Sequence, residues 1–369
     1  MLPLSGIRVL DFSTLLPGPM ATLLLAEAGA EVIKVERPDG EDMRRYEPRF
    51  GDTSASFAML NRGKRSVALD LKSPTAKARL RPMLESADVL VEQFRPGVMH
   101  RLGLGYDALR EINPRLIYCS ITGFGQHGPK SPVAAHDLNY QADTGMLGIA
   151  AGSDGAPVVP SALVADIAGG AYPAVMNILL ALRRREHTQA GCHIDISMTD
   201  CLFPFMFWAM GTGSATGKWP RPGQEMLSGG SPRYQVYRTA DGQFLAAAPL
   251  EDRFWSVFCE VVELPAHLRD DSKDAHATRR AVAELISLRS AAEWLGRFEG
   301  KDACCNLVRN VSDALKDSHY QERGLFTRSV TTAAQDTLMA GSVPIVDTLR
   351  DSRTKARYPA LGADNDLLA

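Results

Sequence analysis

The sequence lacks the features that most directly mark a membrane, metal-binding or nucleic-acid-binding protein. An apolar run at 203–210 is too short to span a bilayer. The net charge is only −2, so no overall positive field favours nucleic acid or an anionic membrane. None of the six cysteines has Cys-x-x-Cys or metal-ligand spacing, and no two histidines have the helical spacing of metal ligands. We therefore expect no metal, no membrane and no nucleic acid, and reduced thiols typical of a cytosolic protein.

Two common nucleotide motifs are also missing. The turn after the first expected strand reads Leu-Pro-Gly-Pro (16–19) rather than Gly-x-Gly-x-x-Gly, and no Walker sequence occurs. Glu36 could bind a ribose, but Arg37 follows it directly and a guanidinium there prefers a phosphate. These features make nicotinamide chemistry an unfavourable interpretation.

What is present is the pattern of a two-domain α/β protein of 369 residues, 45% hydrophobic and 23% charged. A strand at 7–13, a helix at 19–28 and a strand at 30–36 form a β-α-β unit. Strands at 66–71, 87–92 and 116–122 and a helix at 75–85 continue the alternation, which predicts a mostly parallel sheet with helices on both faces. The immediate start of a strand is not typical of a signal sequence, and the last residues match no targeting tag, so we expect a cytoplasmic location.

The second half of the chain changes character. Glycine and proline at 211–232 predict a linker or mobile loop, and 234–238 and 243–248 flank Ala-Asp-Gly as a hairpin. Helical segments follow to about 318, giving a smaller α+β domain. We predict a large domain over 1–210, a linker or active-site loop over 211–232, a small domain over 233–324, and a tail over 325–369 that returns to the large domain.

Two residues suggest chemistry. His136 lies in Ala-His-Asp-Leu-Asn-Tyr, and Asp166 lies among small and aliphatic residues, where we expect it to cap a helix over 171–185. If both converge on one substrate carbon, the imidazole and carboxylate could remove a proton from one face and return one from the other. Backbone N–H groups at the start of the Asp166 helix could then stabilise an enolate oxygen. A satisfied core His–Asp pair and a simple N-cap are the structural alternatives.

Basic residues follow several of the expected strands. They are Arg62, Lys64, Arg65, Arg95 and Arg101. Because open α/β sheets bind ligands at the carboxyl ends of their strands, these cations together favour a phosphorylated adenosine carrier.

Several motifs resemble the class III CoA-transferase (CaiB/BaiF) superfamily, which includes the α-methylacyl-CoA racemases. They are Ile-Arg-Val-Leu-Asp-Phe, Pro-Gly-Pro, the run Leu-Ala-Glu-Ala-Gly-Ala-Glu-Val-Ile-Lys-Val-Glu-Arg-Pro, Asn-Arg-Gly-Lys-Arg-Ser, Phe-Arg-Pro-Gly-Val, Thr-Gly-Phe-Gly-Gln-His-Gly-Pro and Pro-Ala-Leu-Gly-Ala-Asp. The resemblance implies an interlocked homodimer of chains with a Rossmann-like large domain and a small domain. It also implies coenzyme A as part of the substrate, with no prosthetic group. The implied coenzyme A contacts are Leu16, Arg37, Leu60, Asn61, Arg62, Arg95 and Arg101.

The resemblance leaves two reactions. In transferases, an aspartate matching Asp166 attacks the acyl-CoA; in racemases, it pairs with a histidine matching His136, and a glutamate matching Glu251 holds the imidazole. The chain departs from the racemase pattern at Ala135, usually glycine, and at Ser228, usually aspartate. We favour epimerisation of a 2-methyl-branched or related acyl-CoA, with acyl-CoA:carboxylate CoA transfer as the alternative; the acyl group stays open.

Overall fold

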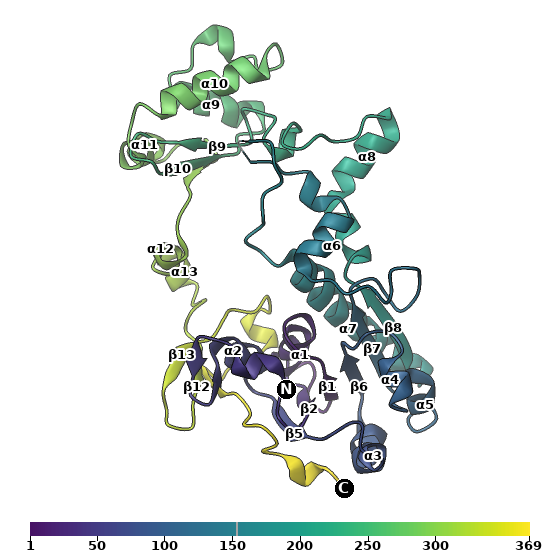
Figure 1. The fold of residues 1–369 in the computed structure, drawn as a ribbon. Coiled ribbons are helices and arrows are strands. Elements are labelled where there is room, and N and C mark those ends of the chain that lie inside the picture. The colour runs from purple at the N-terminus through teal and green to yellow at the C-terminus, as the bar shows by residue number, and fades with distance from the viewer. Residues whose placement is uncertain (153) are drawn as a thin grey trace. The chain divides into compact units, whose positions relative to one another are not determined.

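The computed structural model describes residues 1–152 and 154–369 and divides into two compact units (Figure 1). The first unit comprises residues 1–144, 161–205 and 318–369, and the second comprises 145–160 and 206–317. The sequence had assigned 145–160 to the large domain, whereas the structure places this segment with the smaller unit. The C-terminal segment belongs to the first unit, with the strands of the N-terminal half.

The first unit is built on a six-stranded sheet in which every pairing is parallel. The strand order is β5-β2-β1-β6-β7-β8. The bounds are β1 Arg8–Phe12, β2 Glu31–Glu36, β5 Arg65–Ala68, β6 Val89–Glu92, β7 Ile117–Thr122 and β8 Cys192–Ser197. The predicted parallel sheet is therefore confirmed. Sequence reasoning missed β8, an edge strand in which exposed and less exposed residues alternate.

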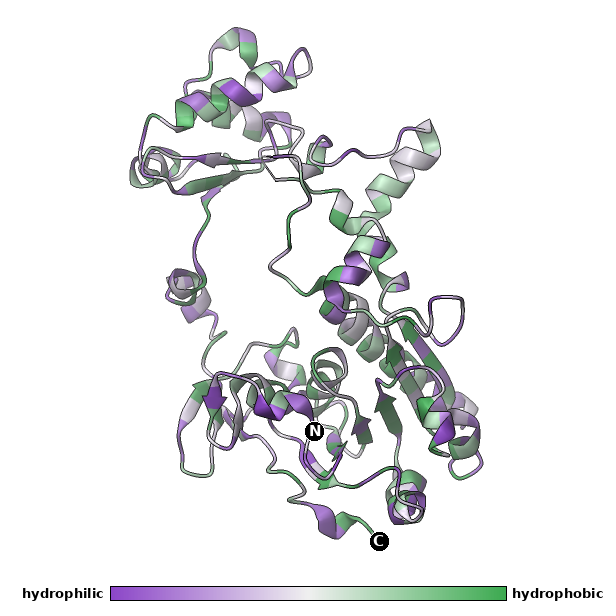
Figure 2. Cartoon of the chain, in the orientation of Figure 1, coloured by the Kyte–Doolittle hydropathy of each residue, from purple (hydrophilic) through white to green (hydrophobic). Residues whose placement is uncertain are grey.

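Helices cover the sheet because each crossover between parallel strands needs one. The helices between these strands are α1 Pro17–Glu27, α2 Ala55–Asn61, α3 Ala76–Ser86, α4 Val98–Arg101, α5 Tyr106–Arg110, α6 Asp137–Asp143 and α7 Tyr172–Thr188. The short helix α13 Ser318–Glu322 lies outside these crossovers. Leu80, Met99 and Leu109 from α3, α4 and α5 pack with Leu10 and Leu90 of the strands in one buried cluster. α1 and α7 contact each other and the sheet outside that cluster. In Figure 2, β6 and β7 are mainly green, as expected for strands buried on both faces.

Short strands complete the first unit. They are β3 Arg49–Phe50, β4 Thr53–Ser54, β12 Ser329–Thr331, β13 Thr337–Met339 and β14 Lys355–Arg357. The last three form their own sheet in the order β13-β12-β14. Asp364, near the C-terminus, binds Arg65 at 2.8 Å and accepts the Ser66 N–H at 2.9 Å, which joins the C-terminal segment to β5.

The second unit contains an antiparallel sheet in the order β11-β10-β9 and a group of helices. Its elements are β9 Gln235–Arg238, β10 Phe244–Ala247, β11 Cys305–Leu307, α8 Phe207–Thr216, α9 Asp252–Val261, α10 Ala275–Ile286, α11 Ala291–Phe298 and α12 Val311–Leu315. The predicted hairpin is confirmed as β9 and β10. Trp255, Phe258, Trp294 and Phe298 form the centre of its core.

Two local predictions were wrong. The start of the expected loop 211–232 is helical, because α8 runs to Thr216. A Cβ at Gly213 would lie 2.3 Å from the Trp219 ring, so this glycine allows the indole to lie against the helix. Asp166 does not cap α7. It lies in the first turn of a π-helix, Ala165–Ala171, that leads into α7, and the N-cap of this π-helix is Val164.

The continuous helical segment Ala165–Thr188 is the one described segment long and apolar enough to cross a membrane. It contacts β7, β8 and α1, and it buries Ala174, Ile178 and Ala181. A core helix that packs on a sheet has the same length and composition, so this feature is weak evidence for a membrane.

Candidate active site

His136 directly precedes α6 and adopts an extended backbone, with φ −128° and ψ 176°. Its N–H donates to Asn139 Oδ1 at 3.1 Å, and its carbonyl accepts the Asn139 N–H at 2.8 Å. These reciprocal hydrogen bonds fix the start of the helix. The imidazole is left exposed at the wall of a cavity.

Asp137 connects His136 to Asp166. One carboxylate oxygen of Asp137 accepts the Asp166 N–H at 2.9 Å, and the other accepts Gln141 Nε2 at 2.6 Å. Asp137 is buried, so its carboxylate ties α6 to the π-helix that contains Asp166. Asp137 therefore orients the backbone at Asp166. Because the Asp166 N–H already donates to Asp137, this one N–H group is not free to donate to an enolate oxygen.

The π-helix lies close to the sheet because of two glycines. A Cβ at Gly169 would lie 2.7 Å from the Met198 carbonyl oxygen, and a Cβ at Gly170 would lie 3.0 Å from Pro17 Cβ. Only glycine permits these approaches without displacement. The Ala-Asp-Ile-Ala-Gly-Gly sequence therefore brings the Asp166 backbone against α1 and the end of β8.

His136 and Asp166 line the same cavity, of about 430 Å³. Its walls follow β1, β6 and β7, and the switch between the two directions of strand addition falls between β1 and β6. Ligands bind at such switch points in open α/β sheets. The remaining lining residues are Thr14, Leu15, Pro17, Gln93, Phe94, Arg95, Pro96, Ile121, Thr122, Gly123, Ser131, Val133, Ala134, Ala135, Asn139, Tyr140 and Met198. Sequence reasoning missed most of these, although Thr14, Leu15 and Gln93 lie directly after or close to the ends of the recognised strands β1 and β6.

Burial raises the pKa of Asp166 to about 6, and the neighbouring Asp137 carboxylate adds to this effect, while His136 opposes it. The carboxyl can therefore gain and lose a proton near neutral pH, as an acid–base group requires. Burial also raises the pKa of Tyr140 to about 12. The Tyr140 hydroxyl donates to the Ala135 carbonyl at 2.8 Å, which holds the segment before His136.

The predicted coenzyme A contacts are in different environments. Arg95 is exposed and lines the cavity, and Arg101 is exposed on α4. Arg37 is exposed and forms ion pairs with Asp39 at 3.0 Å and Asp42 at 2.6 Å. Leu16, at the N-cap of α1, and Leu60, in α2, are half-buried.

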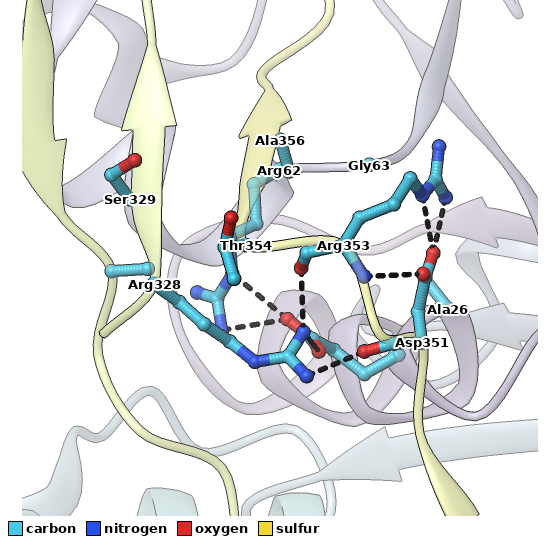
Figure 3. Close-up of a pocket in the computed structure, with 11 residues that line it drawn as sticks. Ala26, Arg62, Gly63, Arg328, Ser329, Asp351, Arg353, Thr354 and Ala356 are labelled. Atoms are coloured by element: carbon cyan, nitrogen blue, oxygen red, sulfur yellow. Dashed lines mark hydrogen bonds and ion pairs between the residues drawn. The ribbon is translucent and has the colours of Figure 1, made fainter. Parts of the chain in front are cut away.

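Asn61 and Arg62 are buried and have internal partners. Asn61 donates to the Phe57 carbonyl at 3.1 Å. Arg62 forms an ion pair with Glu27 at 2.9 Å and donates to the Gly341 carbonyl at 3.0 Å. Figure 3 shows Arg62 beside Arg328 in a small separate pocket of about 40 Å³. Only a rearrangement would free the Arg62 guanidinium for a ligand.

Glu251, the third predicted catalytic residue, belongs to the second unit. It is the N-cap of α9 and its side chain is exposed. Near this helix start, Arg233 forms ion pairs with Asp252, the first residue of α9, at 2.6 Å and with Asp271 at 2.7 Å.

The first unit thus belongs to the class of doubly wound α/β folds, with His136 and Asp166 in one cavity at the carboxyl edge of the sheet. The family model described as CoA-transferase family III matches residues 4–365, and the chain belongs to this family.

Curated relatives include enzymes of both reactions. Human alpha-methylacyl-CoA racemase is 37% identical over 90% of this chain and 84% of its own length. The mouse racemase is 39% identical over 88% of this chain and 82% of its own length. Acetyl-CoA:oxalate CoA-transferase of Acetobacter aceti is 37% identical over 89% of this chain and 86% of its own length. The chain is therefore an enzyme of the racemase and CoA-transferase superfamily.

Solved structures agree on the fold. A CAIB/BAIF family protein from Brucella suis has a TM-score of 0.85 and 27% identity, covering 99% of this chain and 98% of its own. A protein from Mycobacterium tuberculosis has a TM-score of 0.86 and 27% identity, covering 100% of this chain and 99% of its own.

Proposed function

We propose that the protein epimerises the α-carbon of a 2-methyl-branched or related acyl-CoA thioester. The observation that carries this proposal is the presence of both His136 and Asp166 in one cavity, with the Asp166 pKa near 6. One of the two takes the α-proton, which leaves an enolate, and the other delivers a proton to the opposite face of that carbon. The two residues exchange roles with the handedness of the substrate.

The enolate oxygen needs hydrogen-bond donors. The Asp166 N–H already donates to Asp137, so another donor must fill this role.

Coenzyme A would be held by exposed cations of the first unit. Arg95 lines the cavity, and Arg37 and Arg101 are accessible for phosphates. The half-buried Leu16 and Leu60 would shape the nucleotide side, whereas the buried Asn61 would act only by supporting its neighbours. Arg62 would contribute by holding Glu27, since its guanidinium is buried.

Glu251 would hold the imidazole of His136, as the resemblance implies. The variant Glu251→Gln keeps the size of the side chain and removes its charge. We expect this variant to show a shifted pH dependence of kcat. Its inhibition constant for free coenzyme A should equal that of the wild type, because Glu251 is not a proposed coenzyme A contact.

A homodimer is also proposed. An apolar groove of about 550 Å³ runs between α1, α7 and residues 344–349. On α7, the apolar side chains of Met176 and Leu180 are 56% and 62% exposed. Exposed apolar side chains that lie together are typical of a protein–protein interface. Light scattering after size-exclusion chromatography should give twice the chain mass of 40.1 kDa.

The cytoplasmic location stays a prediction, which cell fractionation would test.

The function is tested by incubating a chiral 2-methylacyl-CoA in deuterium oxide. We expect deuterium at the α-position and loss of optical purity. His136→Ala and Asp166→Ala should abolish both, whereas His187→Ala, which removes an exposed imidazole at the end of α7, should not.

Acyl transfer is the second candidate, favoured by the 37% identity to the Acetobacter transferase. Here a carboxylate oxygen of Asp166 would attack the thioester carbonyl, forming an anhydride and releasing the coenzyme A thiolate. Scrambling of label between two acids, a hydroxylamine-sensitive adduct and full activity in His136→Ala would select this reaction. Absence of α-deuterium across a panel of acyl-CoA thioesters would reject epimerisation.

A further inference from the structure

Two charged side chains that sequence reasoning left without a role lie beneath the cavity. Lys34, in the mostly buried strand β2, and Glu41 form an ion pair at 2.9 Å. Their side chains are 0% and 2% exposed. Burying such a pair is expensive unless further hydrogen bonds satisfy both charges, so its partners indicate what the pair does.

Besides each other, Lys34 and Glu41 each bind one backbone group of the turn after β1. Lys34 Nζ donates to the Ser13 carbonyl at 2.8 Å, and Glu41 Oε2 accepts the Leu15 N–H at 2.7 Å. The Ser13 N–H is held separately by Asp11 Oδ1 at 2.9 Å. The ion pair thus binds the backbone of the turn on both sides of Thr14.

This turn is strained. Leu15 has φ 61°, the left-handed region that a residue with a side chain adopts only at an energetic cost. Such strain persists where surrounding contacts impose it, and it concentrates at functional sites. Thr14 and Leu15 both line the cavity, so the strained conformation shapes its wall.

The turn also connects to Asp166. It leads directly into α1, where the Gly18 N–H donates to Gln93 Oε1, a cavity residue, at 3.0 Å. Pro17 lies close to Gly170, within the π-helix of Asp166. A shift of the turn would therefore move the cavity wall and the support of the carboxyl together.

We propose that Lys34 and Glu41 are a positioning pair: they hold the 13–17 turn in its strained form and so set the position of Asp166 relative to the substrate. The inference rests on the proposed function only for its kinetic consequence. A displacement of about 1 Å at a reacting centre can lower the rate by about 100-fold.

The test uses Glu41→Gln, which keeps the side-chain size and removes the charge that pairs with Lys34. We expect kcat for α-deuterium exchange to fall by about 10- to 100-fold, on the scale of misplaced reacting groups. In Leu15→Gly, where positive φ is no longer strained, the same substitution should cost several-fold less. If the ion pair contributed only to stability, Glu41→Gln would lower the stability of the wild type and of Leu15→Gly equally, and kcat would fall by the same factor in both.

Asp88→Asn is the matched control. Asp88 pairs with buried Arg185 at 2.7 Å and accepts the Arg8 N–H, at the amino end of the sheet. We expect it to lower the melting temperature and to leave kcat unchanged.

Amide hydrogen exchange measured by mass spectrometry gives a readout independent of the reaction. Peptides covering 12–20 should exchange faster in Glu41→Gln, and in Glu41→Asp if the first variant does not fold, but not in Asp88→Asn. Unchanged protection of 12–20 would overturn the inference whatever the enzyme's reaction. Faster exchange in a protein that lacks epimerase activity would support the positioning of the turn and reject the proposed function alone.

Discussion

The raised pKa of Asp166 implies that this residue lowers the stability of the folded protein at neutral pH. Its pKa of about 6, compared with 3.8 ordinarily, means that the folded state binds the proton more tightly than the unfolded state. The cost is absent below about pH 3.8 and is complete above about pH 6. A shift of about two units corresponds to at most about 3 kcal/mol.

Asp166→Asn removes this ionisation and keeps the shape of the side chain. We therefore expect the variant to be inactive in α-deuterium exchange and more stable than the wild type at pH 8. At pH 5 the wild type has taken up part of its proton, so the gain should shrink by about 1.5 kcal/mol. Partial solvent exposure of the carboxyl reduces both figures without changing their sign.

Urea unfolding at pH 5 and pH 8, at one protein concentration, measures the difference. Asp302→Asn, which removes an exposed carboxylate, controls for the change in net charge. Equal effects of Asp166→Asn at the two pH values, or a larger gain at pH 5, would refute the assignment of Asp166 as a carboxyl kept partly protonated by burial.

Three further outcomes follow from the geometry. Asp137→Asn keeps an oxygen acceptor and removes the like charge, so the Asp166 pKa should fall and the acid limb of the kcat/KM profile should move to lower pH; an unmoved limb contradicts this. Gly123→Ala would place a Cβ 2.4 Å from the Tyr140 ring, so exchange activity should drop by at least about 10-fold with the fold retained by circular dichroism. Trp294→Ala should cost about 3–5 kcal/mol in urea unfolding, because the indole is fully buried and donates to Ile286; a cost below about 1 kcal/mol would contradict the described core.

The sequence alone determined a large parallel sheet, because most of its strands are mainly apolar runs separated by helical segments and glycine, but it did not show the edge strand β8. It also determined the hairpin of the small unit. An acid in an apolar context and the family motifs singled out Asp166 and His136 as candidates, and their catalytic role stays a prediction. These are local properties, because hydrophobic periodicity and turn residues act over a few positions.

The tertiary structure decided what each polar group contacts. It showed that Asp137 takes the Asp166 N–H, that Arg62 is committed to Glu27, and that Asp166 lies in a π-helix instead of capping α7. It also revealed the Lys34–Glu41 pair beneath the 13–17 turn. Such contacts join residues far apart in the chain, and their geometry depends on how the strands and helices pack, which no local pattern encodes.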